Sequence, residues 1–417
     1  MQYVLKNKDK EIVRFSVESV KQIERGIEFF TKEIQNVSVL NEALLPINID
    51  INDLPMSLES FIKHRKAPNN RENIRNIIAT YNKNKTEELM DYIDVSLGLS
   101  LNDSYWIIPS NKDYKWKDYN LYQNAFNEVL ERVAFGIGNA HIKGLTSSPE
   151  FTTNGMLKKC WHREEQHIYL YKGSSTQSTD GREYGGKEAY AEYYMSQIAE
   201  VMEFDYVPYD LKMFHNQLVS SCPIFTNENE GFVPMYYLLR DNDRKLKGLN
   251  LLKALREVYN DEVKLGDMLL FDSLIYNIDR HLGNFGMIVD NNTGEILRPA
   301  PIFDNGYSMM NLLYKDDLDN VALTLNYSQS YLELNFDLQM KLFVESRHTT
   351  NLEKLTNFTF KRHEQYNLSN EWLESIEKCI QQRAKKALEF IEEKSLNHNM
   401  QQEQDSTPKT HKAKRRR

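Results

Sequence analysis

Asp279 and Asn284 are separated by four residues in a short polar stretch, and Asp304 follows twenty residues after Asn284. Carboxylate and amide oxygens are hard ligands of the kind that Mg²⁺ prefers. Asn284 and Asp304 can therefore hold a divalent cation, and Asp279 can accept a proton from a hydroxyl group. A cation beside a proton acceptor suits phosphoryl transfer, because divalent cations neutralise the charge of the phosphoryl group that moves.

Two residues upstream complete a set suited to this reaction. Phosphoryl transfer from a nucleotide needs a lysine that reaches the α- and β-phosphates and, as a rule, a glutamate on the next helix that fixes this lysine. Lys172 ends an apolar strand, and Glu192 lies on the helix that follows, with Glu188 as the alternative. The gap between Asp279 and Asn284 is also the Asp-to-Asn spacing of the protein-kinase catalytic loop.

Each of these features is weak evidence by itself. An isolated Asp-Arg-His stretch is usually a surface or structural cluster, and a lysine on a strand is usually a solvated charge at a sheet edge. Asn305-Gly306 alone is a turn dipeptide. The prediction depends on the order of the whole set along the chain: a strand lysine, a helix glutamate, a second strand with a hinge, a helix, the Asp-x4-Asn loop, an apolar strand over 301–303 and an Asp-x-Gly triplet.

The elements that must position these residues come with strands first and helices later. Residues 168–172 form a compact apolar β run, and an amphipathic helix begins after residue 187. A second strand is expected over 218–225, and the polar loop 226–231 that follows is a candidate hinge. Beyond it the sequence is mostly helical and includes a late amphipathic helix from about residue 370 to 393. This order indicates an α+β fold.

The composition is that of an ordinary globular protein, with 41% hydrophobic and 27% charged residues in a chain of 417. No stretch approaches the roughly 18 uninterrupted apolar residues of a membrane helix. The first residues are broken by charge and lack the apolar region of a signal peptide. Three cysteines that are far apart fit a reducing compartment. We therefore expect a cytoplasmic protein without a membrane partner.

The net charge of −8 conceals an asymmetry along the chain. The last twelve residues carry six lysines and arginines and no acid, which leaves 46 basic against 60 acidic residues elsewhere, a net charge of −14. An acidic body is poorly suited to non-specific nucleic-acid binding. No direct nucleic-acid contact is therefore expected, except a weak one through the basic tail.

Residues 277–286, Asn-Ile-Asp-Arg-His-Leu-Gly-Asn-Phe-Gly, resemble the catalytic loop of HipA-like serine/threonine kinases, a bacterial group that includes the toxin kinases of toxin–antitoxin pairs. The resemblance covers roughly residues 150 to 395. It extends to residues 152–158, in the place of the family's phosphate-binding loop, and to 192–199, which are similar to its glutamate-bearing helix. Residues 99–106 resemble a motif of uncharacterised HipA-like proteins.

The resemblance implies a bilobal protein-kinase-like fold with a mostly helical C-lobe and an N-terminal accessory region. The activity implied is that of an ATP- and Mg²⁺-dependent protein serine/threonine kinase of toxin or effector type that phosphorylates itself, with an antitoxin-like partner. The regions expected are an accessory region over 1–95, an N-lobe over 96–225, a C-lobe over 226–398 and a disordered basic tail over 399–417.

The resemblance also implies a role for each site residue. Asp279 is the catalytic aspartate, Asn284 and Asp304 hold Mg²⁺, and Lys172, fixed by Glu192, contacts ATP. The phosphate-binding loop has the family's place but no Gly-x-Gly-x-x-Gly pattern, so its backbone near Gly155 would cradle the phosphates; its residues are Thr153, Asn154 and Gly155. The adenine is expected against the backbone at Phe225 and Thr226, and Thr152 or Thr153 is expected to be the self-phosphorylated residue.

Two other functions remain open. Phosphoinositide kinases also use an Asp-Arg-His-x-x-Asn loop, so the acceptor could be a lipid, although the acidic body and the lack of a lipid anchor weigh against this. A non-catalytic kinase-fold module that binds or regulates a partner is the second. The presence of Lys172, Asp279, Asn284 and Asp304 together argues against that module.

Overall fold

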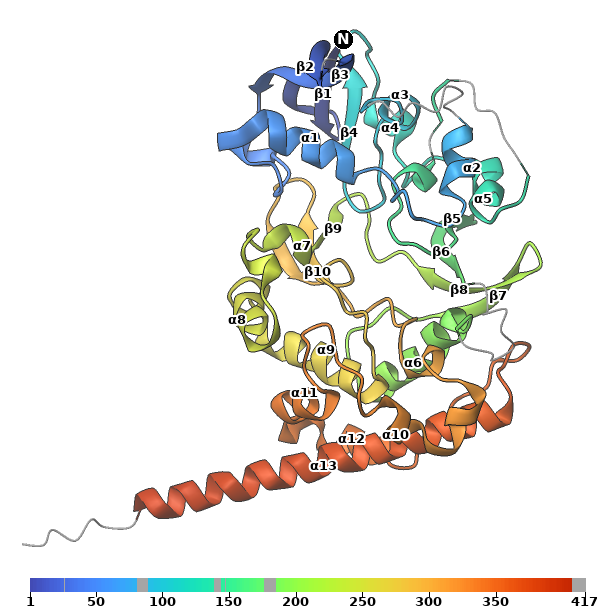
Figure 1. Ribbon diagram of the computed structural model, residues 1–417, viewed down its shortest axis with the longest axis vertical. Coiled ribbons are helices and arrows are strands. Elements are labelled where there is room, and N and C mark those ends of the chain that lie inside the picture. Colours follow the sequence, from blue (N-terminus) through green and yellow to red (C-terminus); the bar gives the residue numbers. More distant parts are fainter. Residues whose placement is uncertain (26, 81–88, 139–143, 147, 176–184, 407–417) are drawn as a thin grey trace, which may run out of the picture.

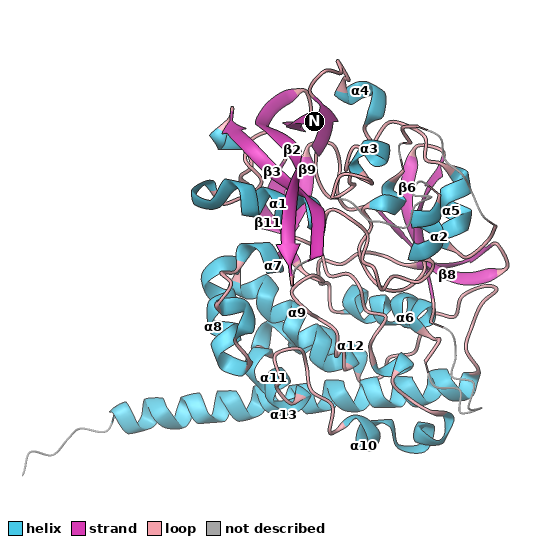
Figure 2. Cartoon of the chain, turned by 45° about the horizontal axis from the view of Figure 1, so that its top comes forward, coloured by secondary structure: helices cyan, strands magenta, loops and turns pink. Residues whose placement is uncertain are grey.

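The computed structural model describes residues 1–25, 27–80, 89–138, 144–146, 148–175 and 185–406. Strands dominate the part of the molecule drawn at the top of Figure 1, and helices dominate the part at the bottom. Figure 2 shows the same division, with the strands grouped on one side of the helical part. The predicted α+β class is confirmed.

The first sheet is antiparallel and has the strand order β3-β2-β1-β4. Its strands are β1 (Gln2–Asn7), β2 (Lys10–Glu24), β3 (Ile27–Val39) and β4 (Tyr105–Pro109). Helix α1 (Leu54–His64) buries Leu58, Phe61 and Ile62 in the core that this sheet covers. Strand β4 pairs with β1 although it lies beyond residue 95, where the accessory region is expected to end.

Four short helices lie between and after these strands. They are α2 (Ile74–Ala79), α3 (Ile93–Ser96), α4 (Trp116–Tyr119) and α5 (Glu128–Ala134). Helix α5 begins where the Asn127 side chain accepts hydrogen bonds from the backbone N–H groups of Val129 and Leu130. Of the helical pattern between residues 70 and 94, only α2 and α3 are helical here, and residues 81–88 lie outside the described part.

The second sheet is antiparallel and has the strand order β5-β6-β8-β7. Its strands are β5 (Lys159–Glu164), β6 (His167–Gly173), β7 (Asp210–Phe214) and β8 (Gln217–Pro223). Helix α6 (Glu188–Val201) packs beside it and buries the apolar stripe that contains Ala191, Met195 and Ile198. The predicted strands near 168–172 and 218–225 and the helix after residue 187 are confirmed.

The helical part holds the largest hydrophobic core. Its helices are α7 (Met235–Leu238), α8 (Gly248–Tyr259), α9 (Glu262–Ile275), α10 (Val321–Leu325), α11 (Phe336–Phe343), α12 (Thr349–Leu355) and α13 (Asn370–Ser406). A third sheet, with the order β11-β10-β9, joins it to the rest; its strands are β9 (Glu230–Pro234), β10 (Gly286–Asp290) and β11 (Ile296–Pro299). Residues 301–303 do not form a strand. Ile302 instead forms an isolated parallel β-bridge with Tyr206.

Helix α13 is longer than the sequence pattern predicts. Its apolar stripe, which includes Leu373, Ile380 and Ile391, is buried in the core as expected. The helix then continues to Ser406 and projects beyond the body (Figure 1). Residues 399–406 of the segment expected to be disordered are therefore helical, and 407–417 lie outside the described residues. Within the part of the chain that the structure describes, no helix is long and apolar enough to span a membrane.

Candidate active site

Lys172 on β6 lies between two carboxylates that come from distant parts of the sequence. Its Nζ atom is 2.8 Å from Oε1 of Glu192 on α6. The same ammonium forms an ion pair with Oδ1 of Asp304. Lys172 and Glu192 are buried, whereas 27% of the Asp304 side chain is exposed. A buried cation is tolerated when such partners satisfy it. The three side chains therefore form one electrostatic unit, and Asp304 is its most exposed member.

The alternative glutamate on α6 has another partner. Glu188 accepts hydrogen bonds from the Oγ and the backbone N–H of Ser175, at 2.5 and 3.2 Å. Glu192, one turn further along the helix, takes the contact with Lys172 through one oxygen. Its second oxygen accepts a hydrogen bond from the backbone N–H of Asn305 at 2.7 Å. Glu192 therefore joins α6 to both the lysine and the Asp304 segment.

The charges of this unit are set by burial and by the contacts within it. Burial would lower the pKa of Lys172, but the Asp304 and Glu192 carboxylates hold this pKa above its usual range. Burial would raise the pKa of Asp304, but the Lys172 and Lys159 ammonium groups hold it below its usual range. Lys172 is therefore a cation and Asp304 an anion at neutral pH.

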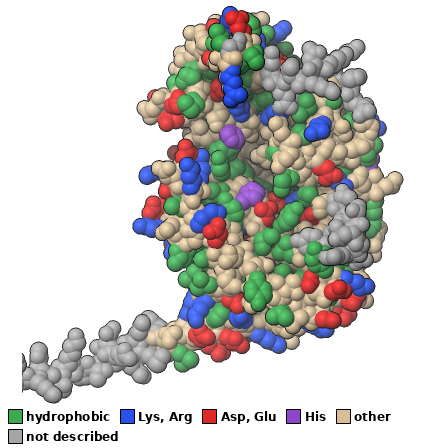
Figure 3. Space-filling model, viewed as in Figure 1, with side chains coloured by type: hydrophobic (Ala, Val, Ile, Leu, Met, Phe, Trp, Pro, Cys, Tyr) green, Lys and Arg blue, Asp and Glu red, His purple; other side chains and the backbone are tan. Residues whose placement is uncertain are grey.

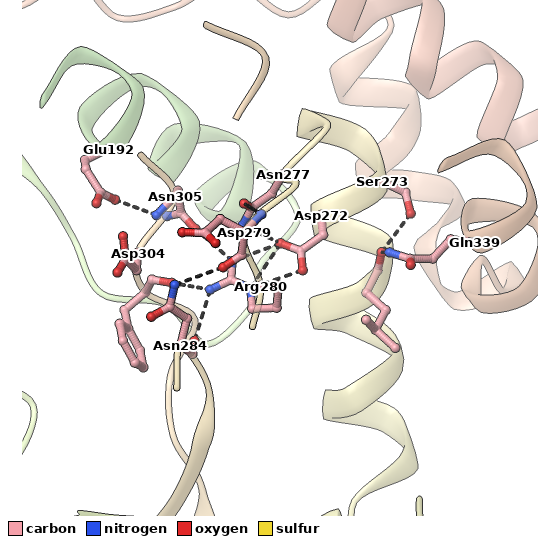
Figure 4. A network of polar contacts seen from close by, with 12 residues as sticks. Glu192, Asp272, Ser273, Asn277, Asp279, Arg280, Asn284, Asp304, Asn305 and Gln339 are labelled. Carbon is pink, nitrogen blue, oxygen red and sulfur yellow. Dashed lines mark hydrogen bonds and ion pairs between the residues drawn. The ribbon is translucent and has the colours of Figure 1, made fainter. Parts of the chain in front are cut away.

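The loop that bears Asp279 and Asn284 is held in place by a buried ion pair. Arg280 Nη2 is 2.9 Å from Oδ1 of Asp272, and both side chains are almost fully buried. Arg280 also donates hydrogen bonds to the backbone oxygens of Asn284 and Phe303 and to Oδ1 of Asn305. Figure 4 shows Arg280 between the loop and the Asp304 segment. One side chain thus holds both halves of the candidate site together.

Asp279 and Asn284 face the site with oxygen atoms that the protein leaves open. Asn284 Nδ2 donates to the backbone oxygen of Asp279 at 2.9 Å, and the Asp279 N–H donates to Oδ1 of Asn277 at 3.1 Å. Among the residues that the structure describes, no donor contacts the Asp279 carboxylate or the Asn284 Oδ1 atom. Burial, reinforced by the negative charge of Asp304, raises the pKa of Asp279 above its usual range.

The backbone of Asp304 has an uncommon conformation. Its φ angle is +58°, in the left-handed region, which costs a non-glycine residue about 1–3 kcal/mol. The Asp304 N–H donates to the Tyr209 hydroxyl oxygen at 3.0 Å. Together with the Glu192–Asn305 contact, this hydrogen bond holds the turn that points the Asp304 carboxylate at Lys172.

Mg²⁺ fits the donor set at this site. It commonly keeps several waters and binds through one or two carboxylates together with phosphate oxygens. Asp304 supplies an ionised carboxylate and Asn284 an open amide oxygen. In the described part of the chain there is no group of three or more His, Cys, Asp or Glu side chains that could hold a metal ion, so a cation here needs phosphate or water ligands as well.

The segment in the place of a phosphate-binding loop lies beside the lysine unit. Lys159, which follows it, is paired in register with Lys172 across β5 and β6. Gly155 has a φ angle of +96°, and a Cβ atom there would lie 2.1 Å from the Lys159 Nζ atom. The Thr153 hydroxyl donates to the Pro149 backbone oxygen at 2.7 Å. Asn154 lies between Thr153 and Gly155 in the sequence. Another residue in place of Gly155 would have a strained backbone, and its Cβ atom would require the end of the Lys159 side chain to move.

Lys159 is a residue that the sequence reasoning missed. It is buried, and among the described residues its ammonium has no hydrogen-bond or ion-pair partner. Burial, together with the nearby positive charge of Lys172, lowers its pKa to about 7. An unpaired buried cation beside Lys172 and Gly155 is suited to an anion such as a phosphate. The available signal was a second lysine directly after the loop, at the start of a strand.

Phe225 and Thr226 follow β8, and Phe225 packs against the residue before Asp304. The Phe225 ring is 5.2 Å from that of Phe303, which precedes Asp304, and 5.5 Å from that of Phe232. The Thr226 hydroxyl donates to the Leu101 backbone oxygen at 2.5 Å. The structure thus places Phe225 in an aromatic cluster next to the site, while the Thr226 side chain turns towards residues 99–106.

The comparisons with known proteins give similarity to solved structures only. No protein-family model matches the sequence, and no curated protein matches it. A structure of the Helicobacter pylori proinflammatory kinase CtkA is 18% identical, with a TM-score of 0.48, over 59% of this chain and 94% of that one. HipA of Shewanella oneidensis, in a structure with HipB and its operator DNA, is 12% identical, with a TM-score of 0.48, over 94% of this chain and 98% of that one. A HipA structure is thus among those to which this chain is similar.

Proposed function

We propose that the chain is a kinase that transfers the γ-phosphoryl group of ATP, in the presence of Mg²⁺, to a serine or threonine hydroxyl of a protein. The observation that carries the proposal is the position of Lys172, which bridges Glu192 and Asp304 near a loop with an open carboxylate and an open amide oxygen. Phosphoryl transfer depends on positioning and charge stabilisation, and these groups provide both.

In this proposal each side chain has one task. Lys172 and Lys159 bind the phosphates, Asp304 and Asn284 hold Mg²⁺, and Mg²⁺ supplies the neutralisation of phosphate charge. Asp279 orients the acceptor hydroxyl and accepts its proton as the new O–P bond forms and the bond from the γ-phosphorus to ADP breaks. The adenine lies against the segment that contains Phe225, where the aromatic cluster offers an apolar face.

Self-phosphorylation is part of the proposal, and Thr153 is the favoured acceptor. Thr152 is buried, with its hydroxyl bonded to the Leu99 backbone oxygen at 2.7 Å, whereas Thr153 is half-buried. Peptide mapping of the phosphorylated protein tests this assignment. Phosphate on Thr153 in the wild type, and its loss in Thr153→Ala, is the expected result; phosphate elsewhere contradicts it.

The protein's mass after incubation with ATP and Mg²⁺ tests the activity itself. We expect added phosphate on the wild type and none on Asp304→Asn. Nucleotide-dependent thermal stabilisation is measured in parallel, because a kinase that modifies only other proteins still binds ATP. No added phosphate and no stabilisation of the wild type would refute the proposal in favour of a non-catalytic binding module.

We further propose that the kinase acts as a toxin or effector with an antitoxin-like protein partner. The support is the sequence resemblance to toxin kinases, which concerns residues 150 to 395. Induced expression of the wild type is expected to arrest growth, and Asp279→Asn is expected to leave growth unaffected. Equal growth with both proteins would contradict a toxin role and leave the kinase activity to be judged by the mass measurement.

A further inference from the structure

A cavity of about 210 Å³ lies where three parts of the chain meet. The accessory unit contributes residues 43–48 and the end of α1, and residues 100–105 form a second wall. The third wall is β9 with the turn between β10 and β11, and Thr152 and Asn154 reach one edge. The face shown in Figure 3 is hollowed near its middle, where hydrophobic and histidine side chains gather. None of Lys172, Glu192, Asp279, Asn284 or Asp304 lines the cavity.

Part of the lining of this cavity is aromatic and apolar, and polar side chains such as Asn48, Asn102 and Asn291 line the rest. Phe61 meets the Tyr105 ring edge to face at 6.1 Å, and His64 meets the Tyr237 ring in the same way at 6.0 Å. Val289 lines the opposite side. Aromatic walls of this kind favour apolar or ring-shaped groups.

The charged groups at the base are already neutralised by one another. Both terminal nitrogens of Arg65 bind the Asp103 carboxylate, at 2.8 and 3.0 Å. Arg65 also donates to the backbone oxygens of Gly98 and Tyr105, at 2.8 and 2.7 Å. Because this ion pair is satisfied within the protein, neither Arg65 nor Asp103 attracts a charged group; Asp290, which accepts a hydrogen bond from the Asn292 N–H, also lines the cavity.

The wall formed by β9 is also the support of the candidate catalytic loop. Pro234 pairs with Gly286, and the Met235 N–H donates to the Phe285 backbone oxygen at 2.9 Å. The Tyr236 N–H donates to the Leu282 oxygen at 2.9 Å. The cavity therefore shares one wall with the loop that bears Asp279, and its edge with the phosphate loop.

We propose that the cavity is a specificity pocket that takes one uncharged apolar or aromatic side chain of the acceptor polypeptide; the inference rests on the proposed function. Its volume of about 210 Å³ is below the roughly 300–1,000 Å³ of sites that enclose a whole small-molecule ligand, which favours a single side chain. The satisfied Arg65–Asp103 pair disfavours a charged side chain. The net charge of −14 outside the last twelve residues disfavours a nucleic acid.

The first test measures occupancy of the pocket without any need for catalysis. The probes are the N-acetyl amides of phenylalanine, leucine, lysine and glutamate. Their binding to the full chain is measured by saturation-transfer NMR. Ile47 lines the cavity and is 49% exposed, so Ile47→Trp fills it from the surface; Ile51, 43% exposed and outside it, gives the matched control Ile51→Trp. We expect the phenylalanine and leucine amides to bind the wild type and Ile51→Trp, and to lose most of their signal with Ile47→Trp.

ATP with Mg²⁺ in the same samples is expected to leave the signal of the phenylalanine amide unchanged. Competition by ATP would overturn the inference, because the cavity would then belong to the nucleotide site. Three other results would overturn the inference as well. The apolar amides do not bind, the lysine or glutamate amide gives a signal equal to theirs, or Ile47→Trp binds the apolar amides as well as the wild type does.

The second test assigns the pocket to the acceptor. A positional peptide library with a fixed serine or threonine is phosphorylated by the wild type, Ile47→Trp and Ile51→Trp. We expect one position with an apolar or aromatic preference, lost at least ten-fold in Ile47→Trp alone, with an unchanged KM for ATP. Phosphorylation without such a preference overturns the inference and leaves the proposed function intact. Absence of phosphorylation and of ATP binding overturns the proposed function, and with it the acceptor role, even where the amides bind.

Discussion

At the scale of single residues, the candidate site is defined by the side-chain oxygens and cations that have no partner among the described residues. Lys172 is satisfied on two sides, whereas the Asp279 carboxylate, the Asn284 amide oxygen and the Lys159 ammonium have no protein partner among the described residues. The sequence predicted the first three of these residues from type and spacing. It could not predict Lys159, because only the pairing of β5 with β6 shows that this lysine faces Lys172 and not the solvent.

Replacement of Asp279 by asparagine separates catalysis from folding. We expect Asp279→Asn to lower kcat by about 10²–10⁴-fold, the usual contribution of a positioned general base. The affinity for ATP and the free energy of unfolding should change little, because no hydrogen bond to this carboxylate is lost. Steady-state kinetics and urea unfolding check the two parts, and wild-type kcat in this variant would remove Asp279 from the mechanism.

Replacement of Lys159 by methionine should affect stability and binding in opposite directions. The pKa of Lys159 in the folded protein is about 7, against about 10.4 in an unfolded chain. Between these values the unfolded state binds more protons, so this residue makes stability rise with pH from about 7 to about 10. We expect Lys159→Met to be more stable than the wild type at pH 7 and to lose this part of the pH dependence.

The same variant should bind ADP less tightly, because an anion loses its buried cation. Urea unfolding at pH 7 and pH 9, with and without ADP, measures both effects. A variant that is less stable than the wild type and binds ADP equally well would show that Lys159 has only a packing role.

At the scale of elements, one turn of helix α6 decides which glutamate serves the site. Local periodicity was enough to predict α6 and the strand before it; Glu192 was the preferred glutamate and Glu188 the alternative. The choice is made by the packing of α6 against the Asp304 segment, since Glu192 also binds the Asn305 N–H. This contact joins residues more than a hundred positions apart, so no local pattern could reveal it.

Two isosteric substitutions on this helix form a matched pair. We expect Glu192→Gln to lower kcat/KM for ATP at least ten-fold, because Lys172 loses one of its two anionic partners. Glu188→Gln should retain wild-type kcat/KM, since this residue contacts Ser175 and not Lys172. Kinetics on both purified variants provide the measurement, and an equal loss in the two would mean that the identity of the glutamate had been assigned wrongly.

At the scale of the whole molecule, the accessory unit is attached to the loop between β8 and β9. Trp116 Nε1 donates to Glu228 at 2.7 Å, and Gln123 donates to the same carboxylate at 2.9 Å. Lys8 contacts Asn229 and Asn292 at 3.0 and 2.6 Å. The sequence predicted a hinge at residues 226–231, and in the structure residues on both sides of the expected boundary at residue 95 contact this loop.

Loss of one such contact should loosen the loop without removing the aromatic ring that packs beside it. We expect Trp116→Phe to lower the free energy of unfolding by about 1.5–3 kcal/mol, the range for a hydrogen bond to a charged group. Amide hydrogen exchange over residues 226–231 should become faster, while exchange in α9 remains unchanged. Unaltered exchange in the loop would show that Trp116 does not restrain it.

The pairing of β1 with β4 also has a consequence for synthesis on the ribosome. Residues 2–7 emerge before residues 105–109, the strand that covers their second edge, and ribosomes add roughly 5–20 residues per second. Nascent chains arrested before and after residue 109 leaves the exit tunnel should therefore differ in protease sensitivity at the N-terminus. For about 5–20 s, strand β1 therefore has one edge without the strand that pairs with it in the folded protein.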